Sequence, residues 1–206
     1  MSELPVSPAC ERNKGPIQAV LKCVFEQPGV ILEIGSGTGQ HAVHFARELS
    51  HLVWHTSEQP GALSPVQAWL ASARLSNLHG PHALDVSAAE WPLSRVDGVF
   101  SANTAHIMHW PEVVAMFQGV GRILVAGGRF CLYGPFMRHG EHNSESNRAF
   151  DASLRQRDPG MGIRDIEDLN RLAGDAGLSW VAEHAMPANN RLLVWQKAPE
   201  RPEEGA

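Results

Sequence analysis

The chain has 206 residues, of which 43% are hydrophobic, and a formal net charge of −5 at pH 7. This length fits one domain with a substantial core. The negative balance, with Lys and Arg scattered along the chain, excludes the basic surface that nucleic-acid-binding proteins use. No apolar stretch is long enough to span a bilayer.

The N-terminus and the cysteines indicate a cytoplasmic protein. Residues 1–10 lack the charged and apolar regions of a signal peptide. Cys10, Cys23 and Cys131 are an odd number with no CxxC spacing, which is typical of reduced thiols. We therefore expect a cytoplasmic location, no membrane or nucleic-acid partner, and a small-molecule ligand.

Helical and strand patterns alternate along the chain, as in an α/β sheet with helices on both faces. A helical apolar face that ends at Val24 precedes a buried strand at 30–34. The other expected strands are 51–56, 81–84, 97–101, 128–133, 180–184 and 191–196. The other expected helices are 40–49, 62–76, 113–124, 146–155 and 165–176, with a polar loop over 134–147. Residues 1–197 are predicted to form a single doubly wound domain, and 198–206 a disordered tail.

A glycine-rich turn follows the first expected strand and is the strongest functional signal. The segment 33–39 reads Glu-Ile-Gly-Ser-Gly-Thr-Gly, an E-x-G-x-G-x-G pattern between a strand and a helix. Such a turn predicts a nest of exposed N–H groups for an anionic or hydroxyl-rich ligand. A dinucleotide fingerprint would need a small residue at position 40, where Gln40 stands. The pattern favours S-adenosylmethionine, and a tight loop that binds nothing is the alternative.

Polar residues follow the next strands, where ligands bind in sheets of this kind. The carboxylate of Glu58 is placed to accept hydrogen bonds from ribose hydroxyls, or is a solvated loop acid. Asp85 has two equal interpretations, an adenine contact or a helix cap. Asn103 is expected beside the methyl group of a bound S-adenosylmethionine, although Asn is also common in turns. His106 is a candidate base or substrate contact, although a lone His is more often structural.

The eleven histidines include several H-x-x-H pairs. None of these pairs carries the carboxylate of H-E-x-x-H, several fall in expected strands or loops, and no cysteine joins them. We therefore expect no metal site.

The chain resembles a methyltransferase-like family, formerly a domain of unknown function, whose animal members are called methyltransferase-like protein 26. The resemblance covers about residues 8 to 197. It is carried by segments spread along the chain, namely 11–14 with Pro16 and Ile17, 35–41, 84–86, Asn103 with His106, 133–136, 157–159, 162–165 and 186–190. Family members tend to carry Asp where this chain has Glu58, which keeps the carboxylate but lengthens its reach.

The resemblance implies a class I methyltransferase fold, which is a Rossmann-like, seven-stranded, mostly parallel sheet with the last strand antiparallel. It also implies a methyltransferase that converts S-adenosylmethionine to S-adenosylhomocysteine, with an unidentified acceptor. The residues expected to bind the cofactor are Glu33, Gly35, Ser36, Gly37, Gly39, His41, Glu58, Asp85 and Asn103.

On the substrate side, Arg12, Asn13 and Asn189 are expected to bind the acceptor, with Asn143, Asn147 and Asn190 as further polar candidates. His106 and Tyr133 are the catalytic candidates, and the N-terminal helical segment is expected to act as a lid that excludes water. Two alternatives stay open, a non-catalytic S-adenosylmethionine-binding protein and an NAD-dependent oxidoreductase.

Overall fold

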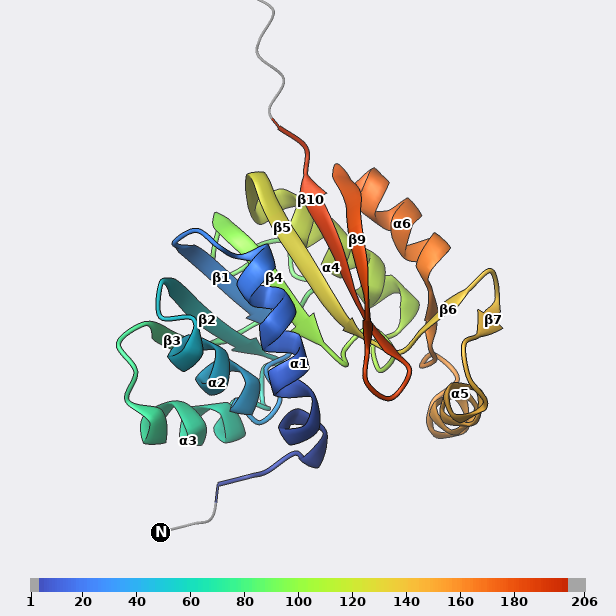
Figure 1. Ribbon diagram of the computed structural model, residues 1–206, viewed down its shortest axis with the longest axis horizontal. Helices are drawn as coiled ribbons and strands as arrows, with labels where there is room; N and C mark the ends of the chain where they lie inside the picture. The colour runs from blue at the N-terminus through green and yellow to red at the C-terminus, as the bar shows by residue number, and fades with distance from the viewer. Residues whose placement is uncertain (1–3, 200–206) are drawn as a thin grey trace, which may run out of the picture.

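A twisted sheet of seven strands runs through the computed structural model, which describes residues 4–199 (Figure 1). The strand order is β3-β2-β1-β4-β5-β10-β9. Strands β1 to β5 pair in parallel, whereas β10 runs antiparallel to both β5 and β9. The expected mostly parallel, seven-stranded α/β sheet is confirmed. Its strands are β1 (Gly29–Ile34), β2 (Leu52–Glu58), β3 (Leu78–Ala83), β4 (Val96–Ala102), β5 (Leu124–Gly134), β9 (Leu178–Met186) and β10 (Asn190–Lys197).

Helices cover both faces of this sheet, because the strands carry apolar side chains on both sides. Along β5, Phe130 and Leu132 belong to one hydrophobic cluster, and Cys131 and Tyr133 belong to the other. This alternation is the period of two that a strand imposes. The first cluster packs on α4 (Trp110–Ile123) and α6 (Ile166–Asp175), and the second on α1 (Pro8–Val24), α2 (Gln40–Glu48) and α3 (Ser64–Ala73).

The segment that follows β5 differs from the prediction. It was expected as a loop, but it contains β6 (Phe136–Arg138) and β7 (Glu141–His142), which form a three-stranded sheet with β8 (Arg164–Asp165). Helix α5 (Glu145–Arg157) completes this region, which lies beside the lower ends of β9 and β10 in Figure 1. Strands of two or three residues have no readable periodicity, and β8 pairs with β6 across α5, so sequence patterns could not reveal this sheet.

The other boundaries lie within a few residues of the expected ones. Strand β3 starts at Leu78 rather than at 81, because this edge strand is largely exposed and lacks a clear apolar pattern. The expected disordered tail falls mostly on residues 200–206, which lie outside the described residues. Between residues 4 and 199, no helix is both long and apolar enough to cross a membrane.

A glycine in α4 fixes the segment that follows β3. A Cβ at Gly119 would lie 2.0 Å from Cζ2 of Trp91, so the indole packs directly on the helix backbone. The Trp91 indole N–H in turn donates to the carbonyl oxygen of Val86 at 3.4 Å. This packing holds the segment 84–91 against the sheet.

Gly119→Ala is therefore expected to lower the free energy of unfolding by about 1–3 kcal/mol, the usual cost of overpacking a core. The matched control is Gly174→Ala in α6, because a Cβ there would meet no heavy atom within 4 Å. That control should leave stability unchanged or raise it by about 0.5–1 kcal/mol. Urea denaturation of both variants measures the difference, and equal stabilities would contradict the packing described.

Candidate functional site

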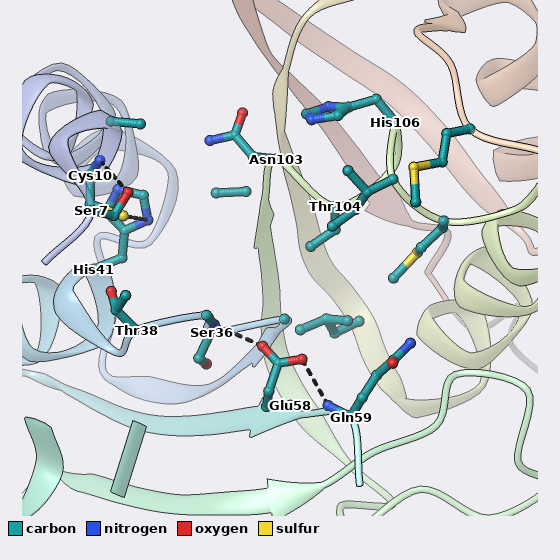
Figure 2. Close-up of a pocket in the computed structure, with 18 of the residues that line it drawn as sticks. Ser7, Cys10, Ser36, Thr38, His41, Glu58, Gln59, Asn103, Thr104 and His106 are labelled. Atoms are coloured by element: carbon teal, nitrogen blue, oxygen red, sulfur yellow. Dashed lines mark hydrogen bonds between the residues drawn. The ribbon is translucent and has the colours of Figure 1, made fainter. Parts of the chain in front are cut away.

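A cavity of about 1000 Å³ opens at the carboxyl ends of β1, β2 and β4 (Figure 2). This volume is at the upper end of the roughly 300–1000 Å³ range of small-molecule sites. Its wall combines the glycine turn after β1, the ends of β2 and β4, the segment after β3, the N-terminal segment and the α5 region. The cavity therefore lies where ligands bind in open α/β sheets.

The glycine turn needs its glycines for two different reasons. Gly35, Gly37 and Gly39 all have positive φ angles, of 70°, 59° and 90°. A Cβ at Gly35 would also lie 2.5 Å from Cγ2 of Thr104, whereas one at Gly37 would meet nothing within 4 Å. Gly35 thus lets β1 approach β4 closely, and Gly37 leaves open space. Both line the cavity with Ser36, while Gly39 packs against α3.

The expected nest of exposed N–H groups needs correction. The Ser36 amide donates to the Ser57 carbonyl at 2.9 Å, and the Gly39 amide donates to the Ser36 carbonyl at 2.8 Å. The Gly37 amide donates to Oε2 of Glu58 at 2.8 Å. Most N–H groups of the turn therefore donate to other groups of the protein and are not free to bind a phosphate.

Glu58 lies at the end of β2 and lines the cavity beside this turn. Its carboxylate accepts from the Gly37 amide through Oε2 and from the Gln59 amide through Oε1, both at 2.8 Å (Figure 2). These two bonds fix the orientation of the side chain. A carboxylate at this place is thus positioned before a ligand arrives.

Glu33 lies behind the turn rather than in the cavity wall. Its side chain is buried, and Oε2 accepts from the Ser36 hydroxyl at 2.9 Å and from the Trp54 indole at 3.2 Å. Burial, with a smaller contribution from the charge of Glu58, raises the pKa of Glu33 to about 7. Glu33 therefore acts on the site by holding Ser36.

Asp85 is exposed and has a local partner. Its Oδ1 accepts from the Ser87 amide at 2.8 Å, a local turn contact. The helix-cap interpretation is wrong, because Asp85 is followed by turns and then by β4 rather than by a helix. Its neighbours Leu84 and Val86 are the residues that line the cavity. The adenine contact of Asp85 stays a prediction.

After β4, the chain turns sharply at Asn103 and brings His106 to the cavity. Asn103 has a positive φ of 60°, and its amide donates to the Tyr133 carbonyl at 2.8 Å. Asn103, Thr104 and His106 all line the cavity (Figure 2). His106 is only 7% exposed. Burial, assisted by Arg164 and Arg157, lowers the pKa of His106 to about 4, so its ring is neutral at pH 7.

His41, Asn13 and Tyr133 form a buried polar group on the opposite side. His41 lines the cavity, and its Nε2 lies 2.6 Å from Oδ1 of Asn13, which assigns the ring proton to Nε2. Burial lowers the pKa of His41 to about 4. The Tyr133 hydroxyl accepts from Nδ2 of the Asn190 side chain at 3.0 Å, and burial raises the pKa of Tyr133. Asn13 and Tyr133 therefore support the wall, whereas His41 and Asn190 form it.

The N-terminal segment is fastened to the glycine turn by Gln40. The Ser7 amide donates to Oε1 of Gln40 at 2.5 Å, and Nε2 of Gln40 donates to Glu11 at 2.8 Å. The Trp69 indole also donates to the Pro5 carbonyl at 2.7 Å. Ser7 and Cys10 thereby become part of the cavity wall (Figure 2).

The expected substrate residues are only partly brought together. Asn147 is buried and lines the cavity, and its Nδ2 donates to the Asn143 side chain at 2.7 Å and to the Asn189 carbonyl at 3.1 Å. Asn189 itself is exposed and acts through this bond. Arg12 is exposed and does not belong to the cavity lining. In residues 4–199, no three His, Cys, Asp or Glu side chains gather in a way that could hold a metal ion.

Several lining residues were missed by sequence reasoning. From the N-terminal segment, the ends of β3 and β4, and the α5 region, these are Ser7, Cys10, Leu84, Val86, Met108, Phe150, Arg157 and Met161. Leu84, Val86 and Arg157 belong to family-like segments, and that was the only signal for them. The others are ordinary side chains that only the tertiary structure brings to one cavity.

The strand order, with β10 antiparallel, defines the class I methyltransferase fold. Among solved structures, an O-methyltransferase family protein from Burkholderia thailandensis matches at a TM-score of 0.81 and 15% identity, over 94% of this chain and 58% of that one. The S-adenosylmethionine-dependent methyltransferase SibL matches at a TM-score of 0.77 and 20% identity, over 92% of this chain and 56% of that one. An O-methyltransferase family 2 protein from Planctomyces limnophilus, in complex with apigenin, matches at a TM-score of 0.80 and 16% identity, over 92% of this chain and 58% of that one. The chain spans just over half the length of these three structures.

The chain itself belongs to the family described as "Protein of unknown function (DUF938)", whose model matches residues 4–197. The more specific resemblance to methyltransferase-like protein 26 stays a prediction.

The buried Glu33 makes stability depend on pH. Its folded pKa of about 7 lies above the usual 4.5, so the folded protein binds more protons within this window and loses stability as the pH rises through it. The difference corresponds to roughly 3 kcal/mol. Glu33→Gln should therefore gain stability relative to the unsubstituted protein as the pH rises from about 4.5 to 7.

Urea denaturation at several pH values measures this trend, with the exposed Glu26→Gln as the control for loss of one carboxylate. A stability difference for Glu33→Gln that stays constant with pH would contradict the assignment.

Proposed function

We propose that this protein is an S-adenosylmethionine-dependent methyltransferase that acts on a small-molecule acceptor. The observation that carries the proposal is the carboxylate of Glu58, which is fixed at the end of β2 beside Gly37 and inside the cavity. A carboxylate held in this way can accept hydrogen bonds from both hydroxyls of an adenosine ribose.

The surrounding residues fit the rest of an adenosyl group. Leu84, Val86 and Met108 supply apolar walls from the ends of β3 and β4, which suit a purine ring. Gly37 leaves room for close approach of a ligand, because a Cβ there would occupy open space. The methionine portion would then lie along Gly35, Ser36 and Asn103, toward His41 and His106.

The hydrogen bonds of the glycine turn favour this cofactor over a dinucleotide. A pyrophosphate needs several free backbone N–H groups at the turn and at the start of the helix. Here the amides of Ser36, Gly37 and Gly39 already have protein partners. An adenosyl group that lacks phosphate makes no such demand, which argues against an NAD-dependent oxidoreductase.

S-adenosylmethionine supplies a methyl group that is already activated by a sulfonium. The protein must therefore align the nucleophile and receive its proton. His106 is the candidate for the second task, because its ring is neutral at pH 7 and lines the cavity. The acceptor oxygen or nitrogen would bond to the methyl carbon as the carbon–sulfur bond breaks, and its proton would pass to His106.

The N-terminal segment is proposed as a lid of a single methyltransferase-like domain over residues 1–197. Ser7, Ala9 and Cys10 cover one side of the cavity, and Gln40 ties this segment to the glycine turn. Closing this side would exclude water from the methyl-transfer step.

Thermal shift tests the cofactor. S-adenosylhomocysteine at about 100 times its Kd should stabilise the fold by roughly 2.7 kcal/mol, and NAD should have no comparable effect. Glu58→Ala should weaken S-adenosylhomocysteine binding about 10- to 100-fold, with an unchanged circular dichroism spectrum. Stabilisation by NAD alone, or unchanged affinity in Glu58→Ala, would overturn the proposed site.

Two variants serve as controls for this experiment. Glu58→Asp keeps a shortened carboxylate and should retain part of the affinity. Glu48→Ala removes an exposed carboxylate of α2 outside the cavity lining and should bind normally.

Transfer of a labelled methyl group from S-adenosylmethionine into a metabolite extract tests catalysis. His106→Gln should bind S-adenosylhomocysteine normally but transfer label about 100-fold more slowly, the usual scale of a lost general base. If the unsubstituted protein binds S-adenosylhomocysteine but labels no acceptor, a non-catalytic binding role is favoured.

A further inference from the structure

One end of the cavity carries an arginine, Arg157, that forms no ion pair among the described residues, although its charge acts on the neighbouring Asp158. Arg157, at the end of α5, lines this end, and its Nη2 donates to Sδ of Met161 at 3.2 Å. Within residues 4–199, no carboxylate lies within ion-pairing distance of Arg157. By contrast, Arg155 on the same helix pairs with Asp151 at 2.9 Å. The guanidinium of Arg157 is thus available to a ligand in the cavity.

A second cation strengthens the field at this end. Arg164 donates to the backbone carbonyls of Ala105 and Met108, at 3.0 and 2.5 Å, which hold its charge in place. Asp151 acts on this charge from a distance, and no ion pair to Arg164 forms within residues 4–199. Glu112 also lines the cavity, but its carboxylate accepts from the His109 amide at 2.7 Å and caps α4. The charges that act on His106 are accordingly those of Arg164 and Arg157.

His106 and Asn147 supply polar atoms without partners at the same end. His106 is more than nine-tenths buried, and in the described part of the chain neither of its ring nitrogens has a hydrogen-bond partner. Asn147 donates through Nδ2 to the Asn143 side chain and to the Asn189 carbonyl, so among the described residues its unpartnered side-chain atom is Oδ1. The ring of Phe150 lies edge-on to His106 with centroids 5.3 Å apart, and Met161 adds apolar surface.

We propose that this end binds the methyl acceptor, and that the acceptor is a small organic acid with a flat apolar body. Its carboxylate pairs with Arg157, its body lies against Phe150 and Met161, and its hydroxyl or amine meets His106. This inference rests on the proposed function and names the substrate class of the same cavity.

The electrostatics of methyl transfer agree with an anionic acceptor. The protein carries a net charge of −5, so its overall field does not attract anions, and the attraction must be local to Arg157 and Arg164. A carboxylate beside Arg157 would offset the two guanidinium charges that disfavour a protonated His106. Binding of the acid therefore makes His106 a better proton acceptor at the moment when a proton has to leave the nucleophile.

The test compares benzoate with benzamide, which share a flat ring and differ in charge, on protein saturated with S-adenosylhomocysteine. Isothermal titration should show benzoate binding about tenfold more tightly than benzamide, on the scale of one charged hydrogen bond. Arg157→Gln should abolish this preference. The control is Arg148→Gln, which removes an arginine from the exposed side of the same helix, outside the cavity lining, and should keep the preference.

The outcomes separate this inference from the proposed function. Failure of the unsubstituted protein to bind S-adenosylhomocysteine would overturn the proposed function, and with it the acceptor assignment. Normal S-adenosylhomocysteine binding without preference for benzoate, including the case in which neither probe binds, would overturn the acceptor assignment alone. So would a preference that Arg157→Gln leaves intact.

Discussion

The cavity depends on the close approach of the two segments that follow β1 and β4, at Gly35 and Thr104. Because a Cβ at Gly35 would overlap Cγ2 of Thr104, this approach is open only to glycine. The Thr104 hydroxyl is in turn 2.6 Å from the Ser101 hydroxyl, which donates to the Ile34 carbonyl at the end of β1. These contacts join the glycine turn to the segment that carries Asn103 and His106.

Polar groups that line the cavity are held by hydrogen bonds to buried polar groups behind them. The turn is held from behind by buried Glu33 through Ser36, and His41 is held by Asn13. These buried partners orient the groups that line the cavity. A side chain fixed in this way loses little further freedom when a ligand binds, so less of the binding free energy is spent on ordering it.

The sequence predicted the sheet well, because its strands and helices have strong periodicity. Strand β1, the glycine turn and α2 were placed almost to the residue, and Glu58 was placed at the end of β2. Residues after the strands were predicted to lie near the site for the same topological reason, and Asn103 and His106 do line the cavity. Tyr133 was expected to lie beside the ligand. The side of a sheet on which a strand residue lies depends on the register of the strand, and Tyr133 lies behind the cavity wall, where it accepts from Asn190.

The end of the cavity that is proposed to bind the acceptor could not be predicted in the same way. It is formed by α5 and the small sheet β7-β6-β8, whose strands are too short to give a pattern and pair across the intervening helix. In the sequence, Phe150 and Arg157 lie on a polar helix, and the family-like segment 157–159 was the only signal for Arg157. Only the tertiary structure brings both residues to the cavity.

The cavity wall includes both Pro5, near the start of the chain, and Asn190, at the start of β10. Contacts between such distant segments form late in folding, because a long loop has to close before they can be made. During synthesis, the glycine turn and β1 to β5 emerge well before β10, which completes the wall. A nascent chain would thus hold its glycine turn for some time without a finished cavity, and binding of the proposed cofactor would report on completed folding.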